Sequence, residues 1–241
     1  MLVLDFIDER AVEEKSQRKF FRKKVREKDK KLKRYSINVN GRNVTVLELT
    51  ENDFKKDDVL TLLKIYKGRV LVPDKFSEKE NLKEYLFSPK EYYRRALLSS
   101  LINQIKTVNK EWKSVTIKTE VFKPFKELYE LVRISKSVII QTEANSYTGK
   151  FINDCYYEYG AIVPIKKEIT STKNDVYLNL DEIDNKGKLM INARGKDFLL
   201  YPDIRYFEIC SEYQKLSQYN IEHNLICSAF SDKYSSAFSD K

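Results

Sequence analysis

The chain has 241 residues, of which 41% are hydrophobic and 34% are charged, and its formal net charge is +9. This composition predicts a folded protein with one main core and excludes a disordered chain. No stretch approaches the roughly 20 apolar residues of a membrane-spanning helix, and the apolar run from Met1 meets acid too early for a signal peptide, so we expect a cytoplasmic protein.

The positive charge is concentrated in one segment near the N-terminus. Residues 15–34 contain twelve Lys or Arg against two acidic residues, a net charge of +10, whereas the other 33 basic and 34 acidic side chains sum to −1. Because this segment lacks Pro and Gly and favours helix, we predict one long helix from about Glu9 to Leu32 with little apolar surface.

This basic helix is a candidate contact for nucleic acid phosphates or an acidic protein partner, while its weak apolar face argues against a membrane surface. The alternative is a helix that is only solvated. The candidate contact residues are Lys15, Arg18, Lys19, Arg22, Lys23, Arg26 and Lys30.

A β-hairpin is predicted after this helix, with its turn at Asn40-Gly41. Both residues tolerate the positive φ angles that a two-residue type I′ turn requires. Pairing the strands across this turn places apolar residues opposite one another on one face. The predicted pairs are Val39 with Arg42, Ile37 with Val44, and Tyr35 with Val46.

Apolar strand segments then alternate with amphipathic helical segments. The predicted helices are 53–67, 89–108, 124–132 and 146–159, and the predicted strands are 69–72, 114–119, 137–141 and 161–165. This alternation is typical of parallel strands joined by right-handed crossovers, with helices on both faces of one sheet. We therefore predict an α/β fold with a doubly wound, mainly parallel sheet in a Rossmann-like three-layer arrangement, preceded by the basic helix and the hairpin.

The remaining chain predicts a second strand pair, a helix and a repeated end. After a polar linker, strands are predicted at 176–180 and 189–193 around a turn at 184–187, followed by a helix at 204–218. Ser-Ala-Phe-Ser-Asp-Lys occurs twice, beginning at Ser228 and at Ser236. Two copies are too few for a solenoid, so we expect a mobile tail. The predicted domains are residues 1–50, an α/β domain of residues 51–227, and a tail of residues 228–241.

Residue types that build catalytic centres are scarce in this chain. His223 is the only histidine, the three cysteines Cys155, Cys210 and Cys227 are widely spaced, and no two of the six glycines are close enough for GxGxxG. These counts exclude multi-histidine metal centres and support neither a zinc site nor a disulfide framework. We therefore expect reduced thiols, no metal and no cofactor.

The nearest approach to a ligand-binding motif is the segment 144–151, between a predicted strand and a predicted helix. It is similar to a phosphate-binding loop in which Ala144 replaces the first glycine and Phe151 replaces the hydroxyl residue that holds magnesium. A helix N-terminus still attracts anions, although the same residues could serve only as a helix cap. The candidate anion-binding residues are Asn145, Ser146, Thr148, Gly149 and Lys150.

Two other groups of polar residues have simpler interpretations. The spacing of Asp181, Glu182 and Asp184 does not fit a calcium loop, so we interpret them as a solvated turn. His223 has no accompanying nucleophile motif and is interpreted as a surface residue. In a parallel sheet the ligand crevice lies beyond the carboxyl ends of the strands, which places it near residues 73–76, 119–121 and 141–149.

The sequence alone does not determine the function. Because no complete catalytic set is present, we favour a non-catalytic α/β binding module for a protein partner or a small anionic ligand. One alternative is a nucleic-acid-binding protein that uses residues 15–34. Another is a divergent enzyme that uses a nucleotide or a phosphorylated metabolite at residues 145–150.

Overall fold

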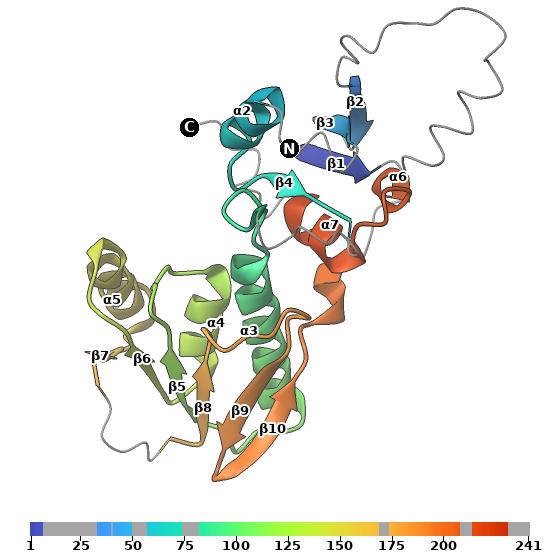
Figure 1. Cartoon of the computed structure of the whole chain (residues 1–241). Helices are drawn as coiled ribbons and strands as arrows, with labels where there is room; N and C mark the ends of the chain where they lie inside the picture. Colours follow the sequence, from blue (N-terminus) through green and yellow to red (C-terminus); the bar gives the residue numbers. More distant parts are fainter. Residues whose placement is uncertain are drawn as a thin grey trace, which may run out of the picture. The chain divides into compact units, whose positions relative to one another are not determined.

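The computed structural model of this chain describes residues 1–6, 33–39, 41–49, 57–73, 82–168, 174–207 and 214–230. The chain divides into two compact units, each with its own β-sheet (Figure 1). Unit 1 comprises residues 1–89 and 207–241, and unit 2 comprises residues 90–206. This grouping places residues 51–89 with the hairpin, which differs from the boundary after residue 50 that we expected. The predicted basic helix and its seven contact residues lie outside the described residues.

The sheet of unit 1 has four strands in the order β2, β3, β1, β4. Its strands are β1 (Leu2–Phe6), β2 (Lys33–Val39), β3 (Arg42–Leu49) and β4 (Val70–Leu71). β1 runs parallel to both β3 and β4, and β2 pairs antiparallel with β3. Strand β1, which we did not predict, therefore lies in the middle of the sheet.

The predicted hairpin is confirmed in its register. Val39 pairs with Arg42, Ile37 with Val44 and Tyr35 with Val46, and Gly41 has a φ of 75°. The ladder continues to Lys33 and Arg34, which pair with Glu48 and Leu47. The last two residues of the basic segment 15–34 therefore belong to a strand, which begins directly after the predicted end of the basic helix at Leu32.

Both faces of the unit 1 sheet are covered by buried apolar residues. Side chains alternate along a strand, so the run Met1–Leu4 reaches both faces and has no exposed position. Helix α2 (Asp57–Ile65) packs on one face, and α6 (Gln214–Ser217) and α7 (His223–Phe230) contribute to the other. The cluster with α2 includes Leu2, Leu4, Leu47, Leu49, Val59 and Leu63, and the cluster with α7 includes Met1, Val3, Val46, Leu216, Ile226 and Phe230.

The C-terminal part of the chain differs from the sequence prediction. The described parts of the predicted helix 204–218 are a short 3₁₀ helix, η3 (Ile204–Phe207), and the single turn of α6. The first copy of the repeat begins inside α7, where Ser228, Ala229 and Phe230 are buried. These three residues belong to the core and not to a tail, whereas the copy from Ser236 lies outside the described residues.

The sheet of unit 2 has six strands in the order β10, β9, β8, β5, β6, β7. The four strands from β8 to β7 are parallel, and β9 and β10 are antiparallel. The strands are β5 (Ser114–Lys118), β6 (Ser137–Gln141), β7 (Ile165–Lys166), β8 (Val176–Asn179), β9 (Leu189–Ala193) and β10 (Lys196–Leu200). The mainly parallel α/β class is thus confirmed, and the predicted bounds of β6 and β9 are correct.

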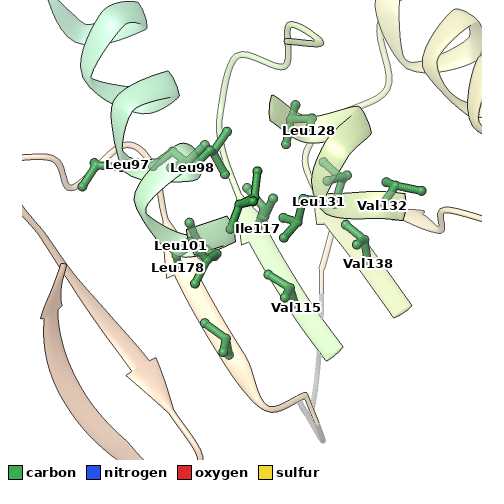
Figure 2. Packing of buried hydrophobic residues seen from close by; sticks show 14 of the residues in the cluster. Leu97, Leu98, Leu101, Val115, Ile117, Leu128, Leu131, Val132, Val138 and Leu178 are labelled. Carbon is green, nitrogen blue, oxygen red and sulfur yellow. The ribbon is translucent and has the colours of Figure 1, made fainter. Parts of the chain in front are cut away.

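The helices of unit 2 lie on one face of its sheet. They are α3 (Lys90–Thr107), α4 (Lys126–Ile134) and α5 (Ser146–Tyr159), and all three contribute to one core cluster. Figure 2 shows Leu97, Leu98 and Leu101 of α3 and Leu128, Leu131 and Val132 of α4 above the strands. In the part of unit 2 that the structure describes, the helices on the second face that we expected are not present.

Strand pairing also corrects one part of the predicted topology. We expected the strand at 69–72 to join the parallel strands of residues 114–165, but β4 pairs with β1 in unit 1. The strand expected at 161–165 is the short β7, which shares only Ile165 with that range. None of the helices in the described part of the chain has the length and hydrophobicity that a bilayer span requires.

Strand β10 was not predicted, although a tight turn connects it to β9. Arg194 and Gly195 have φ angles of 50° and 77°, and Ala193 pairs with Lys196 across them. Two positive φ angles between paired residues are typical of a type I′ hairpin. The hairpin makes β10 the edge of the sheet, next to β9 (Figure 1).

Candidate functional site

The predicted anion-binding residues lie together at the N-terminus of α5, after the end of β6. Asn145 is the N-cap, and its Oδ1 accepts hydrogen bonds from the backbone N–H of Tyr147 at 2.9 Å and of Thr148 at 3.2 Å. Thr148 Oγ1 accepts from the Asn145 N–H at 3.1 Å, which completes a capping box. Asn145 Nδ2 also donates to the Phe122 carbonyl at 3.2 Å.

The hydrogen bonds of Asn145 stabilise the N-terminus of α5 and occupy its amides. The amides of Tyr147 and Thr148, which an anion would contact, already have Asn145 as acceptor. Ser146, Gly149 and Lys150 are exposed. The geometry therefore favours the helix cap over the phosphate-binding loop, and anion binding stays a prediction.

Phe151 explains why the motif departs from a phosphate-binding loop. Its side chain is fully buried in the core of unit 2. Its ring centroid lies 5.3 Å from that of Phe122 and 5.0 Å from that of Tyr129. Aromatic contacts at this distance stabilise a core. The position that would hold magnesium in a phosphate-binding loop is therefore a packing position.

An ion pair lies at the carboxyl ends of β5 and β8. The chain continues from β5 to β6 and from β8 to β9, in opposite directions along the strand order. In α/β proteins such a reversal of the strand order marks the crevice where ligands bind. Asp181 accepts from Arg94 Nη2 at 2.6 Å and from the Glu120 backbone N–H at 2.6 Å, and Arg94 Nε donates to the Leu180 carbonyl at 3.4 Å. Asp181 and Arg94 are both largely buried, so our interpretation of Asp181 as a solvated turn residue was wrong.

The neighbouring acidic residues stabilise the turn after β8. Asp184 Oδ1 accepts from the backbone N–H groups of Lys186 and Lys188, each at 2.8 Å. Glu182 accepts from Asn179 Nδ2 at 2.7 Å. No group of three His, Cys, Asp or Glu side chains in the described ranges could hold a metal ion. His223 is exposed at the start of α7.

Two buried carboxylates attach the segment after β10 to the helices of unit 2. Glu127 accepts from Arg95 Nε at 2.9 Å and from the Tyr206 hydroxyl at 2.7 Å. Asp203 accepts from Ser99, at 2.8 Å, and from Arg205. The hydrogen bonds from Arg205 are the main reason that the pKa of Asp203 falls to about 2, against the opposing effect of burial. Both carboxylates have protein partners, which indicates a structural role.

Two further carboxylates are neighbours in unit 1. Asp5 of β1 pairs in register with Glu48 of β3. Burial raises the pKa of Asp5, and the charge of Glu48 raises it further. Lys33 Nζ lies 3.1 Å from Glu48 Oε2, at ion-pair distance but without the geometry of a hydrogen bond. No third acidic group, His or Cys joins these two carboxylates among the residues described.

An exposed apolar surface lies on the β9–β10 hairpin and the segment after it. Sequence reasoning missed this surface because β10 was not predicted, although the Arg194-Gly195 turn between two apolar runs was a usable signal. Its residues and exposed fractions are Met190 (54%), Phe198 (43%), Leu199 (44%), Tyr201 (55%) and Ile204 (79%).

Comparisons with known proteins add little to this geometry. A comparison with protein-family models gave no match, and neither did one with curated proteins. Among solved structures, the chain is similar to L-tryptophan dehydrogenase from Nostoc punctiforme, with 11% sequence identity and a TM-score of 0.29. The match covers 74% of this chain and 54% of the dehydrogenase, so the chain spans about half of that protein. A similarity at this level supports no inference about activity.

Proposed function

We propose that this chain is a non-catalytic α/β binding module, located in the cytoplasm, whose partner is a protein. The observation that carries the proposal is the strand β10, which forms a sheet edge and bears exposed Phe198 and Leu199. We call residues 196–200, together with Met190, Tyr201 and Ile204, the β10 edge. The free thiol of Cys155 suits a reducing compartment.

An exposed sheet edge binds proteins through its backbone. Unpaired N–H and C=O groups of an edge strand accept an additional strand, and the side chains beside them provide specificity. Exposed apolar side chains that gather on one surface are typical of protein interaction sites. The β10 edge combines both properties: exposed Leu199 and Met190 are paired on one face of the sheet beside the outward backbone groups of β10, whereas Phe198 points to the other face.

The other hypotheses have less support from the described residues. Binding of a small anion at residues 145–150 competes with the hydrogen bonds that Asn145 already makes there. The nucleic-acid hypothesis rests on residues 15–34, of which only Lys33 and Arg34 are described. The enzyme hypothesis uses the same segment as the anion site, where Phe151 occupies the magnesium position.

The test of the proposal is affinity capture from cytoplasmic extract with the full chain as bait. We expect wild type to retain at least one protein, including an untagged second copy of this chain, that Leu199→Pro fails to retain. Tyr157→Ser is the matched control, because Tyr157 is exposed on α5 in the same unit but away from β10. An identical set of retained proteins for wild type and Leu199→Pro would contradict the proposal.

Enzymatic activity would contradict the non-catalytic part of the proposal. We expect no turnover when the purified chain is assayed with nucleotides, sugar phosphates and simple esters. A turnover of about 1 per second or more, which is ordinary for enzymes, would show that the chain is a catalyst.

A further inference from the structure

The hairpin determines which backbone groups of β10 are available. The residues that flank a two-residue turn form a hydrogen-bonded pair, and such pairs alternate along the ladder with non-bonded ones. Ala193 and Lys196 are the flanking pair, and Ile191 and Phe198 are the next bonded pair. Asp197 and Leu199 therefore direct their N–H and C=O groups away from β9, and no described strand pairs with that side of β10.

The side chains of Asp197 and Leu199 lie on the face of the sheet that the helices do not cover. Leu200 lies in the core cluster under the helices, so its neighbours Leu199 and Tyr201 face the opposite way. Leu199 pairs with Met190 of β9. The next row contains Tyr201, whose ring centroid lies 5.0 Å from Lys188 Nζ. On the other side of Leu199, Asp197 accepts from Asn192 at 2.9 Å.

These outward groups allow two-fold antiparallel pairings of β10 with a second β10 whose axis lies at Asp197, at Phe198 or at Leu199. A two-fold axis at Asp197 places two carboxylates directly opposite each other, which is destabilising. An axis at Phe198 places Asp197 of one copy opposite Leu199 of the other, which puts a charge against an apolar side chain. An axis at Leu199 avoids both conflicts.

With the axis at Leu199, the uncovered faces of the two copies are complementary. Across the strands at the axis, Leu199 of one copy then lies beside Leu199 of the second copy, and Met190 lies on the outer side of each. In each flanking row Asp197 lies opposite Tyr201 of the second copy and next to the Lys188 that contacts it. An apolar centre is thus bounded on both sides by a carboxylate that faces a lysine and a phenol.

We propose that β10 pairs antiparallel with β10 of a second copy of this chain, about a two-fold axis at Leu199. The inference rests on the proposed function, since it names the protein partner of the β10 edge. The two six-stranded sheets then form one continuous twelve-stranded sheet. The pairing satisfies the free N–H and C=O groups of Asp197 and Leu199 and covers Leu199 and Met190.

The first experiment compares two substitutions at one position by sedimentation velocity over a wide range of chain concentration. Proline at 199 removes an N–H that points away from β9, so the hairpin keeps its own ladder while the second copy loses a donor. We expect wild type to dimerise, Leu199→Ala to dimerise more weakly, and Leu199→Pro to remain monomeric. Trp112 stacks on Phe198, with ring centroids 5.7 Å apart, and its fluorescence verifies that each variant keeps the hairpin.

The second experiment exchanges charges. Asp197→Lys places a lysine beside Lys188 of the second copy and should weaken dimerisation about tenfold. The double variant Asp197→Lys with Lys188→Asp restores opposite charges in both flanking rows, so dimerisation should recover. A single variant that dimerises like wild type, or a double variant that does not recover, would overturn the register.

The third measurement follows individual amides by hydrogen exchange. The amides of Asp197 and Leu199 should become protected as chain concentration rises, whereas that of Phe198, bonded to β9, should be protected at all concentrations. A chain that stays monomeric, or a dimer that Leu199→Pro leaves intact, would overturn this inference. If the monomeric chain still captures another protein in a Leu199-dependent manner, the proposed function stands without it; if capture is also unaffected by Leu199→Pro, both fail.

Discussion

The two sheets of this chain differ in how many of their faces are covered by apolar residues. In unit 1 apolar clusters cover both faces, so that Val46 and Leu47, adjacent on β3, are both fully buried. In unit 2 the helices cover one face, and Ile191 of β9 is buried while its neighbour Met190 is exposed. The difference shows that an α/β pattern of strands and helices does not by itself imply a sheet covered on both sides.

The two units also differ in their buried polar residues. Among the described residues of unit 1, only Thr45 and Ser228 are polar and buried. Unit 2 buries seven such residues, and several of them are tied to other elements: Thr116, Thr119, Glu127, Thr142, Thr148, Asn179 and Asp203. Unit 1 is therefore stabilised mainly by two apolar layers, and unit 2 by one apolar layer and specific polar contacts.

The largest expected effect tests the polar contacts of unit 2. Glu127→Ala leaves the largely buried Arg95 without its carboxylate, and removing one partner of a buried ion pair costs about 3 to 5 kcal/mol. Trp112 is the only tryptophan and lies in unit 2, so denaturant unfolding followed by its fluorescence measures this unit. Glu130→Ala, in an exposed ion pair with Lys106, should cost less than about 1 kcal/mol; equal losses would refute the distinction.

Truncations at adjacent positions test the coverage of the two sheets. Val46→Ala and Leu47→Ala should each destabilise unit 1, by about 1.5 to 5 kcal/mol, because each removes methyl groups from a different buried face. In unit 2, Ile191→Ala should cost about as much, but Met190→Ala less than about 0.5 kcal/mol. Hydrogen exchange of β3 and Trp112 fluorescence measure the two units. A large loss for Met190→Ala in the monomer would mean that the second face of unit 2 is covered.

The carboxylate of Asp203 should make unit 2 sensitive to acid. Its pKa is lowered to about 2 from an ordinary 3.8, so its stabilising contribution is present above about pH 4 and lost as the pH falls toward 2. This shift corresponds to at most about 2.5 kcal/mol. Asp203→Asn should therefore be less stable than wild type at pH 7, and the gap should narrow as the pH approaches 2. A gap independent of pH would assign the loss to packing alone.

Two substitutions at the N-terminus of α5 distinguish a helix cap from an anion site. Asn145→Ala should cost about 1 kcal/mol because it removes the acceptor for two helix amides. Lys150→Ala should change stability by less than about 0.5 kcal/mol, since the side chain is exposed. Thermal melts with and without added phosphate measure both effects. A phosphate-induced rise in melting temperature that disappears in Lys150→Ala would restore the anion-binding prediction.

The smallest expected effect is an increase in stability, and it concerns unit 1. The raised pKa of Asp5 means that its ionised form opposes folding. Asp5→Asn should therefore stabilise unit 1 by roughly 0.2 to 1 kcal/mol at pH 7, as expected for relief of like charges on paired strands. The gain should vanish as the pH falls through the raised pKa, where Asp5 becomes neutral. Hydrogen exchange of β1 at two pH values measures it; a loss of stability at pH 7 would contradict it.

Local signals in the sequence predicted individual elements well. Helix α5 has the predicted bounds because Asn145 caps one end and Gly160, with a φ of 64°, ends the other. The Asn40-Gly41 hairpin was predictable because its turn determines its register. Cap and turn signals act over a few residues, so one sequence suffices to recognise them.

Features that depend on distant pairing were missed. β4 was assigned to the wrong sheet because an apolar run indicates a strand but not its neighbour. The ion pair of Arg94 with Asp181 joins residues 87 positions apart, and nothing in either local sequence indicates the other. β10 was overlooked because Arg194 is an unusual residue for the first position of a type I′ turn, where Asn, Asp and Gly are favoured.

The composition of unit 1 from two distant parts of the chain has a consequence for biosynthesis. Phe230 and Ile226 of α7 complete the apolar layer over Met1 and Val3, and all of unit 2 is translated between them. Unit 2 is continuous and can close its core as soon as residue 206 has left the ribosome, whereas β1 has to wait for α7. Strand β1 therefore exposes one of its apolar faces until α7 has been translated, and it is there that a chaperone would be needed.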